Sequence, residues 1–223
     1  VNEHEIAGLV GPNGSGKKTL LNLISGIYRL DSGNILFMAE NISKLPPYKI
    51  CAKGIAKTSQ IVQSFPDMTA IENVLVGALF GGDRRMEKKK NSVDRSKELL
   101  DFVGLPEKKF SVAVKNLNIA ELRRVQLAKV LATEPKLLLL DELLTGLNPK
   151  ETDMAIELIG RIRDQGVTIL IVEHVMRVIM GLCNQVTVLH HGEKISEGTP
   201  QEVIRGEDVI KIYLGKKYLL YRG

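Results

Sequence analysis

The hydrophobic positions of this chain follow two different periods. Short apolar runs occupy residues 6–10, 136–140 and 167–172, and polar residues bound each run. Their length and bounds are typical of strands that are buried on both faces in a parallel sheet. Residues 19–27 and 150–165 lie between such runs and have the spacing of helices. Strands that alternate with helices predict an α/β fold whose mainly parallel sheet is covered by helices on both faces.

The middle of the chain has helical periodicity without intervening strands. Apolar residues recur at three- and four-residue spacing in residues 71–79, 92–103 and 121–132. This spacing predicts three amphipathic helices. We therefore expect a helical subdomain at residues 67–131, inserted into the nucleotide-binding α/β core that the remaining residues, 1–66 and 132–223, would form.

The last part of the chain predicts a hairpin and then helices. Two segments, residues 186–189 and 194–197, are separated by a short turn that contains a glycine and are typical of a β-hairpin. Thr199 is placed to cap a helix, and Pro200 stands at the first helical position, where proline is favoured. We expect the chain to continue as helix through residues 208–214.

A glycine-rich segment directly follows the first apolar run and leads into the first predicted helix. Glycines let a backbone approach a phosphate chain without a Cβ clash, and the N–H groups at a helix start attract anions. A lysine in this segment adds a charge for the terminal phosphates. The segment therefore predicts a phosphate-binding loop. Its residues are Gly11, Pro12, Asn13, Gly14, Ser15, Gly16, Lys17, Lys18 and Thr19.

One position departs from the usual phosphate-binding loop. The residue after the loop lysine is ordinarily Ser or Thr, whose hydroxyl binds Mg²⁺. Here Lys18 stands at that place, and Thr19 comes one position later. Two like unit charges about 4 Å apart repel by about 4 kcal/mol at an effective dielectric of about 20. Lys18 would thus repel the metal and slow hydrolysis, unless its side chain points outward or its charge replaces part of the metal's charge.

Polar side chains follow three further predicted strands. Gln60 ends one strand, Asp141 and Glu142 follow the next, and His174 comes just after a third. Ligands of open parallel sheets bind beyond the carboxyl ends of the strands, so we expect these residues to converge on the phosphate loop. There, Asp141 can hold Mg²⁺ and Glu142 can polarise an attacking water. His174 can contact the γ-phosphate, and Gln60 can reach the metal or the water.

Composition narrows the class of protein. The chain is 44% hydrophobic and 26% charged, which excludes a disordered chain, and no apolar run approaches the length of a membrane span. Cys51 and Cys183 lack metal-type spacing and suit free thiols in a reducing cytosol. The net charge of +5 comes largely from residues 84–90, which favour a solvated helix face over a nucleic-acid or membrane surface.

The order of these motifs resembles that of the ATP-binding subunits of ABC transporters over essentially the whole chain. The segments that are most similar to branched-chain amino-acid importer ATPases are residues 146–151, 172–174, 178–181 and the tail at residues 198–215. The resemblance implies a P-loop NTPase core of the ABC ATPase type that uses ATP and Mg²⁺. It also implies a homo- or heterodimer bound to integral membrane permease subunits at the cytoplasmic face of the cell membrane, with no nucleic-acid partner.

In this family, the signature loop of one subunit covers the phosphates bound by the other, and it ordinarily reads Leu-Ser-Gly-Gly-Gln. The matching residues, 117–121, read Leu-Asn-Ile-Ala-Glu here. The resemblance implies that Asn118, Ala120 and Glu121 contact the nucleotide. Asn118 can still donate a hydrogen bond, but the loss of both glycines leaves the backbone less freedom to approach a phosphate.

The first hypothesis is a subunit that hydrolyses ATP to power import of branched-chain amino acids. Lys18 and the altered signature also suit a subunit that binds ATP but hydrolyses it poorly. An exporter ATPase for lipid or lipopolysaccharide would be similar in sequence. Residues 84–90 are the one feature that favours an ABC-type ATPase acting on nucleic acid or the ribosome. We also expect an earlier strand, with a residue that stacks on the nucleobase, to be missing before residue 1.

Overall fold

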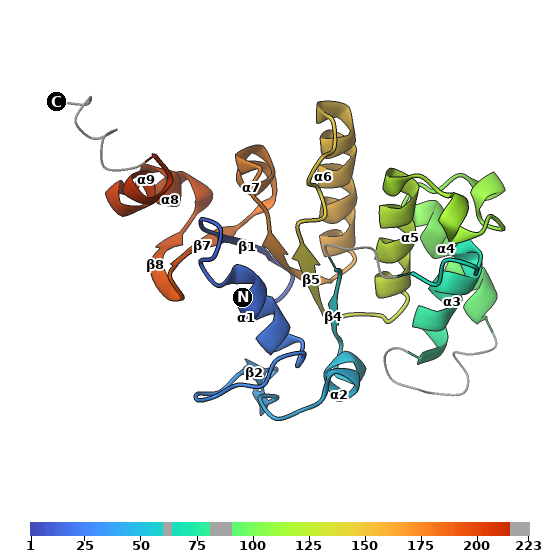
Figure 1. Cartoon of the computed structure of the whole chain (residues 1–223), viewed down its shortest axis with the longest axis horizontal. Coiled ribbons are helices and arrows are strands. Elements are labelled where there is room, and N and C mark those ends of the chain that lie inside the picture. Colours follow the sequence, from blue (N-terminus) through green and yellow to red (C-terminus); the bar gives the residue numbers. More distant parts are fainter. Residues whose placement is uncertain (60–63, 81–90, 215–223) are drawn as a thin grey trace. The chain divides into compact units, whose positions relative to one another are not determined.

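The computed structural model describes residues 1–59, 64–80 and 91–214 (Figure 1). The strands are β1 (Ile6–Val10), β2 (Leu36–Phe37), β3 (Glu40–Asn41), β4 (Ile55–Lys57), β5 (Leu137–Asp141), β6 (Thr168–Val172), β7 (Gln185–His190) and β8 (Glu193–Gly198). The α-helices are α1 (Lys17–Ile24), α2 (Pro47–Ala52), α3 (Ala70–Phe80), α4 (Ser92–Phe102), α5 (Ile119–Leu131), α6 (Pro149–Asp164), α7 (Met176–Leu182), α8 (Pro200–Arg205) and α9 (Glu207–Leu214). Within the described ranges, 3₁₀ turns span Glu107–Lys109 and Val114–Asn116.

The chain forms two compact units, and the larger sheet has β1 near its centre. One unit consists of Val1–Asn22 and Leu139–Gly223, the other of Leu23–Leu138. In the first unit, β1 pairs in parallel with β6 and with β7, so that Gly8 is in register with Ile171 on one side and Val186 on the other. The sheet order is β4-β5-β6-β1-β7-β8. The predicted α/β fold is confirmed.

The first unit buries the apolar runs that predicted its strands. All five residues of β6 are buried, as are four of the five in β1. The hairpin prediction is also confirmed, since β7 and β8 pair antiparallel. Helix α6 begins where Asn148 accepts a hydrogen bond from the N–H of Glu151, and the Glu151 carboxylate accepts one from the Asn148 N–H, which together form a capping box. Thr199 caps α8 in the same way, as predicted.

The second unit contains the three predicted helices of the middle region. Helices α3, α4 and α5 pack against one another. Helix α5 begins two residues earlier than predicted, because the Asn118 side chain caps it and accepts from the N–H of Glu121 at 2.9 Å. Gly77 in α3 lies so close to α5 that an added Cβ would be 2.2 Å from the backbone oxygen of Lys129. The three helices therefore form one packed group.

Gly77 offers a direct test of this helix packing. We expect Gly77→Ala to lower the free energy of unfolding by about 1–3 kcal/mol, because the methyl group meets a backbone oxygen rather than a flexible side chain. Gly160→Ala is the matched control, since Gly160 is also helical and nothing lies within 4 Å of an added Cβ. It should stabilise the chain by up to about 1 kcal/mol. Urea unfolding followed by circular dichroism measures both, and equal effects would contradict the packing argument.

Two strands of the second unit are short. Strand β2 has only 2 residues, because Met38 and Ala39 have positive φ values of 49° and 63° and turn the chain back into β3. The strand that the sequence predicts to end at Gln60 already ends with Lys57 in β4. Gln60 and the basic residues 84–90 lie outside the described residues.

Candidate functional site

The phosphate loop joins β1 to α1 in a conformation that requires glycine. Gly11 has a φ of 150°, and an added Cβ would lie 2.1 Å from the backbone oxygen of Leu189. Gly16 has a φ of 102°, a backbone angle that residues other than glycine rarely adopt. The turn between β7 and β8 also holds the loop, because the N–H of Gly192 donates to the Ser15 oxygen at 3.0 Å. The loop is thus fixed by its neighbour in the sheet as well as by its own sequence.

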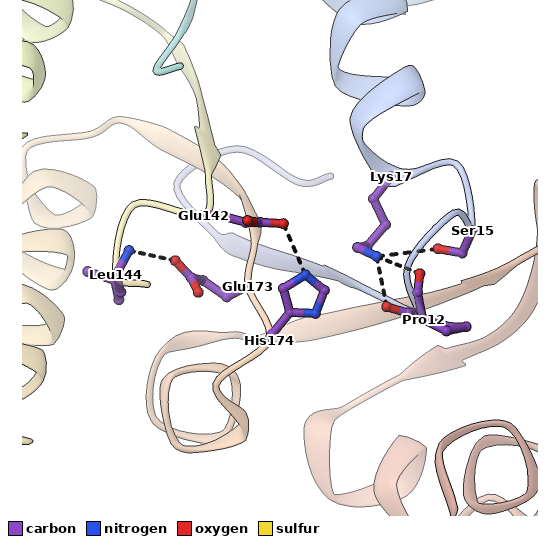
Figure 2. A network of polar contacts seen from close by, with 8 residues as sticks. Pro12, Ser15, Lys17, Glu142, Leu144, Glu173 and His174 are labelled. Atoms are coloured by element: carbon purple, nitrogen blue, oxygen red, sulfur yellow. Dashed lines mark hydrogen bonds and ion pairs between the residues drawn. The ribbon is translucent and has the colours of Figure 1, made fainter. Parts of the chain in front are cut away.

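Lys17 is the first residue of α1, and its ammonium group lies over the loop (Figure 2). Its Nζ donates to the backbone oxygens of Gly11 at 2.7 Å and Pro12 at 2.9 Å, with the Ser15 hydroxyl at 3.5 Å. Only 6% of the residue is exposed. The loop therefore encloses a cation where the sequence predicts that phosphates bind.

Two carboxylates at the end of β5 affect the pKa of Lys17. Burial lowers the pKa of Lys17, and the negative charges of Glu142 and Asp141 oppose that shift. Asp141 is the last residue of β5 and is 3% exposed, whereas Glu142 follows directly and is half-buried. The first unit thus brings the phosphate loop and the Asp-Glu pair into one electrostatic environment, as the strand-end argument predicts.

Glu142 is held by the last residue of β6 and by a residue that follows this strand. Its N–H donates to the Val172 oxygen at 3.0 Å, and its Oε1 lies 3.0 Å from Nε2 of His174 (Figure 2). Its φ of 49° is unusual for a residue with a side chain. Such backbone strain persists only where the surrounding structure imposes it. The Glu142–His174 pair is the polar contact expected of a base and the residue that orients it.

Glu173 also belongs to this site, although our prediction gave it no role. It is 1% exposed, and its Oε1 accepts a hydrogen bond from the backbone N–H of Leu144 at 2.8 Å (Figure 2). Burial raises the pKa of Glu173, and the hydrogen bond from Leu144 opposes that shift. The signal in the sequence is a carboxylate that directly follows a buried, β-branched strand and directly precedes His174.

The remaining residues that the sequence predicts for the site are exposed on the phosphate loop, outside the described residues or in the second unit. Asn13, Gly14, Lys18 and Thr19 are exposed on the loop and the first turn of α1. Gln60 lies outside the described residues. The predicted nucleotide contacts of the signature loop, Asn118, Ala120 and Glu121, belong to the second unit.

The signature residues form the start of α5. The Oδ1 of Asn118 accepts from the Glu121 N–H, and the Glu121 carboxylate accepts from the Asn118 N–H at 3.0 Å. The hydrogen bond from the Asn118 backbone lowers the pKa of Glu121. Ile119 is 69% exposed, and Ala120 follows it in the first turn. This capped helix start is where the signature prediction places an anion contact.

The loop, the buried lysine and the carboxylates at the strand ends define a P-loop nucleotide-binding protein. Comparison with known proteins identifies the family, because the profile described as "ABC transporter" matches residues 1–145. The chain belongs to the ABC transporter family and is an ATPase cassette. Among the described residues, no helix is both long and apolar enough to cross a membrane.

Curated relatives match nearly the whole chain. The high-affinity branched-chain amino acid transport ATP-binding protein LivG of Salmonella typhimurium is 37% identical over 96% of this chain and 88% of its own length. BraF of Pseudomonas aeruginosa, which has the same description, is 35% identical over 97% of this chain and 89% of its own. The lipopolysaccharide export system ATP-binding protein LptB of Escherichia coli is 33% identical over 99% and 90%.

Solved structures have the same fold. A nucleotide-free ATP-binding cassette from an ABC transporter superposes with a TM-score of 0.85 at 27% identity, covering 97% of this chain and 90% of the other. The ADP conformation of the cassette MJ1267 gives the same TM-score, identity and coverage. The fold expected from the motifs, a P-loop NTPase core of the ABC ATPase type, is confirmed.

Proposed function

We propose that this chain hydrolyses ATP to power the import of branched-chain amino acids. The observation that carries the proposal is the Glu142–His174 contact at 3.0 Å, in the same unit as the buried Lys17. Hydrolysis needs a base beside the phosphates, and this pair supplies one. The substrate class follows LivG and BraF, whose names specify branched-chain amino acids.

The proposed reaction is attack of water on the γ-phosphorus of ATP. Lys17 holds the terminal phosphates, and Glu142 accepts a proton from the attacking water as its oxygen bonds to phosphorus. The bond between the γ-phosphorus and the bridging oxygen breaks, which leaves ADP and inorganic phosphate. His174 orients Glu142 through Nε2 and contacts the γ-phosphate. The order of the motifs implies that Gln60 would contact the metal or the water.

Asp141 is the proposed protein ligand for Mg²⁺. The ion usually takes one or two carboxylates together with phosphates and waters, and the buried carboxylate of Asp141 fits that requirement. Among the described residues, no three His, Cys, Asp or Glu side chains could hold a metal by themselves. This agrees with a site that the nucleotide completes. When bound, Mg²⁺ neutralises charge on the β- and γ-phosphates.

Lys18 should raise the Mg²⁺ concentration that the chain needs for half-maximal ATP hydrolysis. We expect Lys18→Thr to lower the Mg²⁺ concentration at half-maximal hydrolysis by about tenfold, because it removes a like charge and adds a hydroxyl ligand. Titrating Mg²⁺ at fixed ATP measures this. Lys18→Met separates charge from ligand, since it removes only the charge. Identical Mg²⁺ curves for all three chains would contradict the prediction. If only the Lys18→Thr chain hydrolyses ATP, the result would favour the alternative that the unchanged chain binds ATP but hydrolyses it poorly.

We also propose a dimer of such subunits, bound to integral membrane permease subunits at the cytoplasmic face of the cell membrane. The support is the start of α5, where a 69% exposed Ile119 lies beside capped N–H groups. A helix N-terminus attracts phosphate, and an exposed isoleucine suits burial at an interface. Asn118, Ala120 and Glu121 would there contact ATP bound by the partner subunit. Light scattering should show a dimer mass in the presence of ATP.

The transported substrate is tested in the assembled transporter. Co-expression with the permease subunits of a branched-chain amino-acid importer, followed by reconstitution in vesicles that contain ATP, should give uptake of labelled leucine. Glu142→Gln in the same preparation is the control for dependence on hydrolysis. Hydrolysis without leucine uptake, but with release of lipopolysaccharide from the membrane, would favour the LptB-like function.

A further inference from the structure

The buried carboxyl group of Glu173 lies at an unusual place for an acidic side chain. The strand before it, β6, is buried throughout, and Glu173 itself is 1% exposed. Burying a carboxyl group is costly unless hydrogen bonds compensate. Here its Oε1 accepts from the N–H of Leu144 at 2.8 Å. The residue is therefore part of the fold's interior, and its visible bond is to the segment that follows Glu142.

This bond is one of two that hold the backbone on both sides of Leu143. The N–H of Glu142 donates to the oxygen of Val172 at 3.0 Å, and the N–H of Leu144 donates to the side chain of Glu173. Within the segment itself, the contact from the Thr145 N–H to the Glu142 oxygen is longer, at 3.5 Å. Consecutive residues at the end of β6 thus fix the turn, while the turn's own bond is weak.

A third residue at this end of β6, His174, holds the Glu142 side chain. His174 follows Glu173 directly, and its Nε2 is 3.0 Å from Oε1 of Glu142 (Figure 2). Because Glu142 has a φ of 49°, its backbone needs outside support to keep this conformation. Residues 172–174 supply that support at three points: the Glu142 N–H, the Glu142 carboxylate and the Leu144 N–H.

We propose that Glu173 is a positioning residue for ATP hydrolysis, which sets the place of the Glu142 carboxylate through its hydrogen bond to the Leu144 N–H. Glu173 acts by its length and its acceptor oxygen, and it does not itself transfer the proton. The inference rests on the proposed role of Glu142 as the base. A displacement of about 1 Å in a reacting group can cost about 100-fold in rate, so such support matters.

Two substitutions separate reach from charge. Glu173→Gln keeps the length and an acceptor oxygen for Leu144 but removes the charge. Glu173→Asp keeps the charge but is one methylene shorter, so its oxygen falls short of the Leu144 N–H. We expect the Gln chain to keep its kcat within about threefold. We expect the Asp chain to lose about 10- to 100-fold in kcat, with KM changed less than about twofold. Glu157→Asp on the exposed face of α6 is the matched control.

Amide hydrogen exchange at Leu144 gives a readout that does not depend on activity. In the full-length chain, exchange at Leu144 should become at least about tenfold faster with Glu173→Asp and should stay near the starting rate with Glu173→Gln. Slow exchange in the Asp chain, an unchanged kcat in it, or a Gln chain as slow in hydrolysis as the Asp chain would each overturn the inference. Normal hydrolysis by Glu142→Gln would instead overturn the proposed base, and this inference with it, whatever the exchange at Leu144 shows.

Discussion

Replacing Lys17 with alanine should weaken ATP binding by at least about 100-fold, which is about 2.7 kcal/mol. The buried ammonium is the cation enclosed by the loop, and hydrogen bonds to charged groups contribute about 1.5–3 kcal/mol each. The same group donates to the backbone oxygens of Gly11 and Pro12, so its loss also loosens the loop. Isothermal titration with ATP measures the affinity directly.

A control for Lys17 should remove a lysine of the same unit whose ammonium group is exposed and paired with a carboxylate outside the loop. Lys194 is exposed on β8 and forms an ion pair with Glu197 at 2.7 Å. Lys194→Ala should leave the ATP affinity within about threefold, because exposed ion pairs contribute little. If Lys17→Ala binds ATP as tightly as Lys194→Ala does, the assignment of this loop to the terminal phosphates is wrong.

Glu142→Gln should have the largest effect on hydrolysis, lowering kcat by about 100- to 10,000-fold. Glutamine has nearly the same shape and can still accept a hydrogen bond from His174, but its amide cannot take the proton of the attacking water. Binding of ATP should stay near the starting affinity, because Lys17 and the loop are unchanged. Single-turnover hydrolysis, measured together with ATP affinity, separates the two steps.

The matched substitution for Glu142 is Glu157→Gln, on the exposed face of α6. It makes the same chemical change away from the strand ends, so kcat should not change by more than about twofold. A Glu142→Gln chain that keeps a tenth or more of the normal rate would require a different base. In that case the proximity of His174 to Glu142 would have a structural purpose only.

Local patterns predicted the parts of this molecule that depend on neighbouring residues. The loop at residues 11–19 could be recognised because glycine spacing, a preceding strand and a following helix all lie within one short segment. The strand ends at Asp141 and His174 could be assigned to one edge because parallel strands share their direction. Both inferences depend on chain geometry that every such sheet obeys.

The contact between Glu173 and Leu144 could not be predicted, because it joins residues that are far apart in the sequence and depends on the strand register. A carboxylate after a strand has no fixed partner until the neighbouring turn is in place. The start of α5, two residues earlier than predicted, does not follow from the apolar spacing for a different reason. The side chains of Asn118 and Glu121 form a capping box, and this polar pairing lies outside the apolar pattern that predicts the helix.

The first unit joins the two ends of the chain, and this has a consequence for synthesis on the ribosome. Strand β1 leaves the ribosome early, but its partners β6 and β7 come much later, with Ile6 in register with Ile169 and Ala7 with Gln185. The second unit is one continuous segment, Leu23–Leu138, and can fold while translation continues. The phosphate loop of the nascent chain therefore has no neighbouring strands to support it until β6 and β7 have emerged. A chain whose synthesis stops before these strands should be unable to bind ATP.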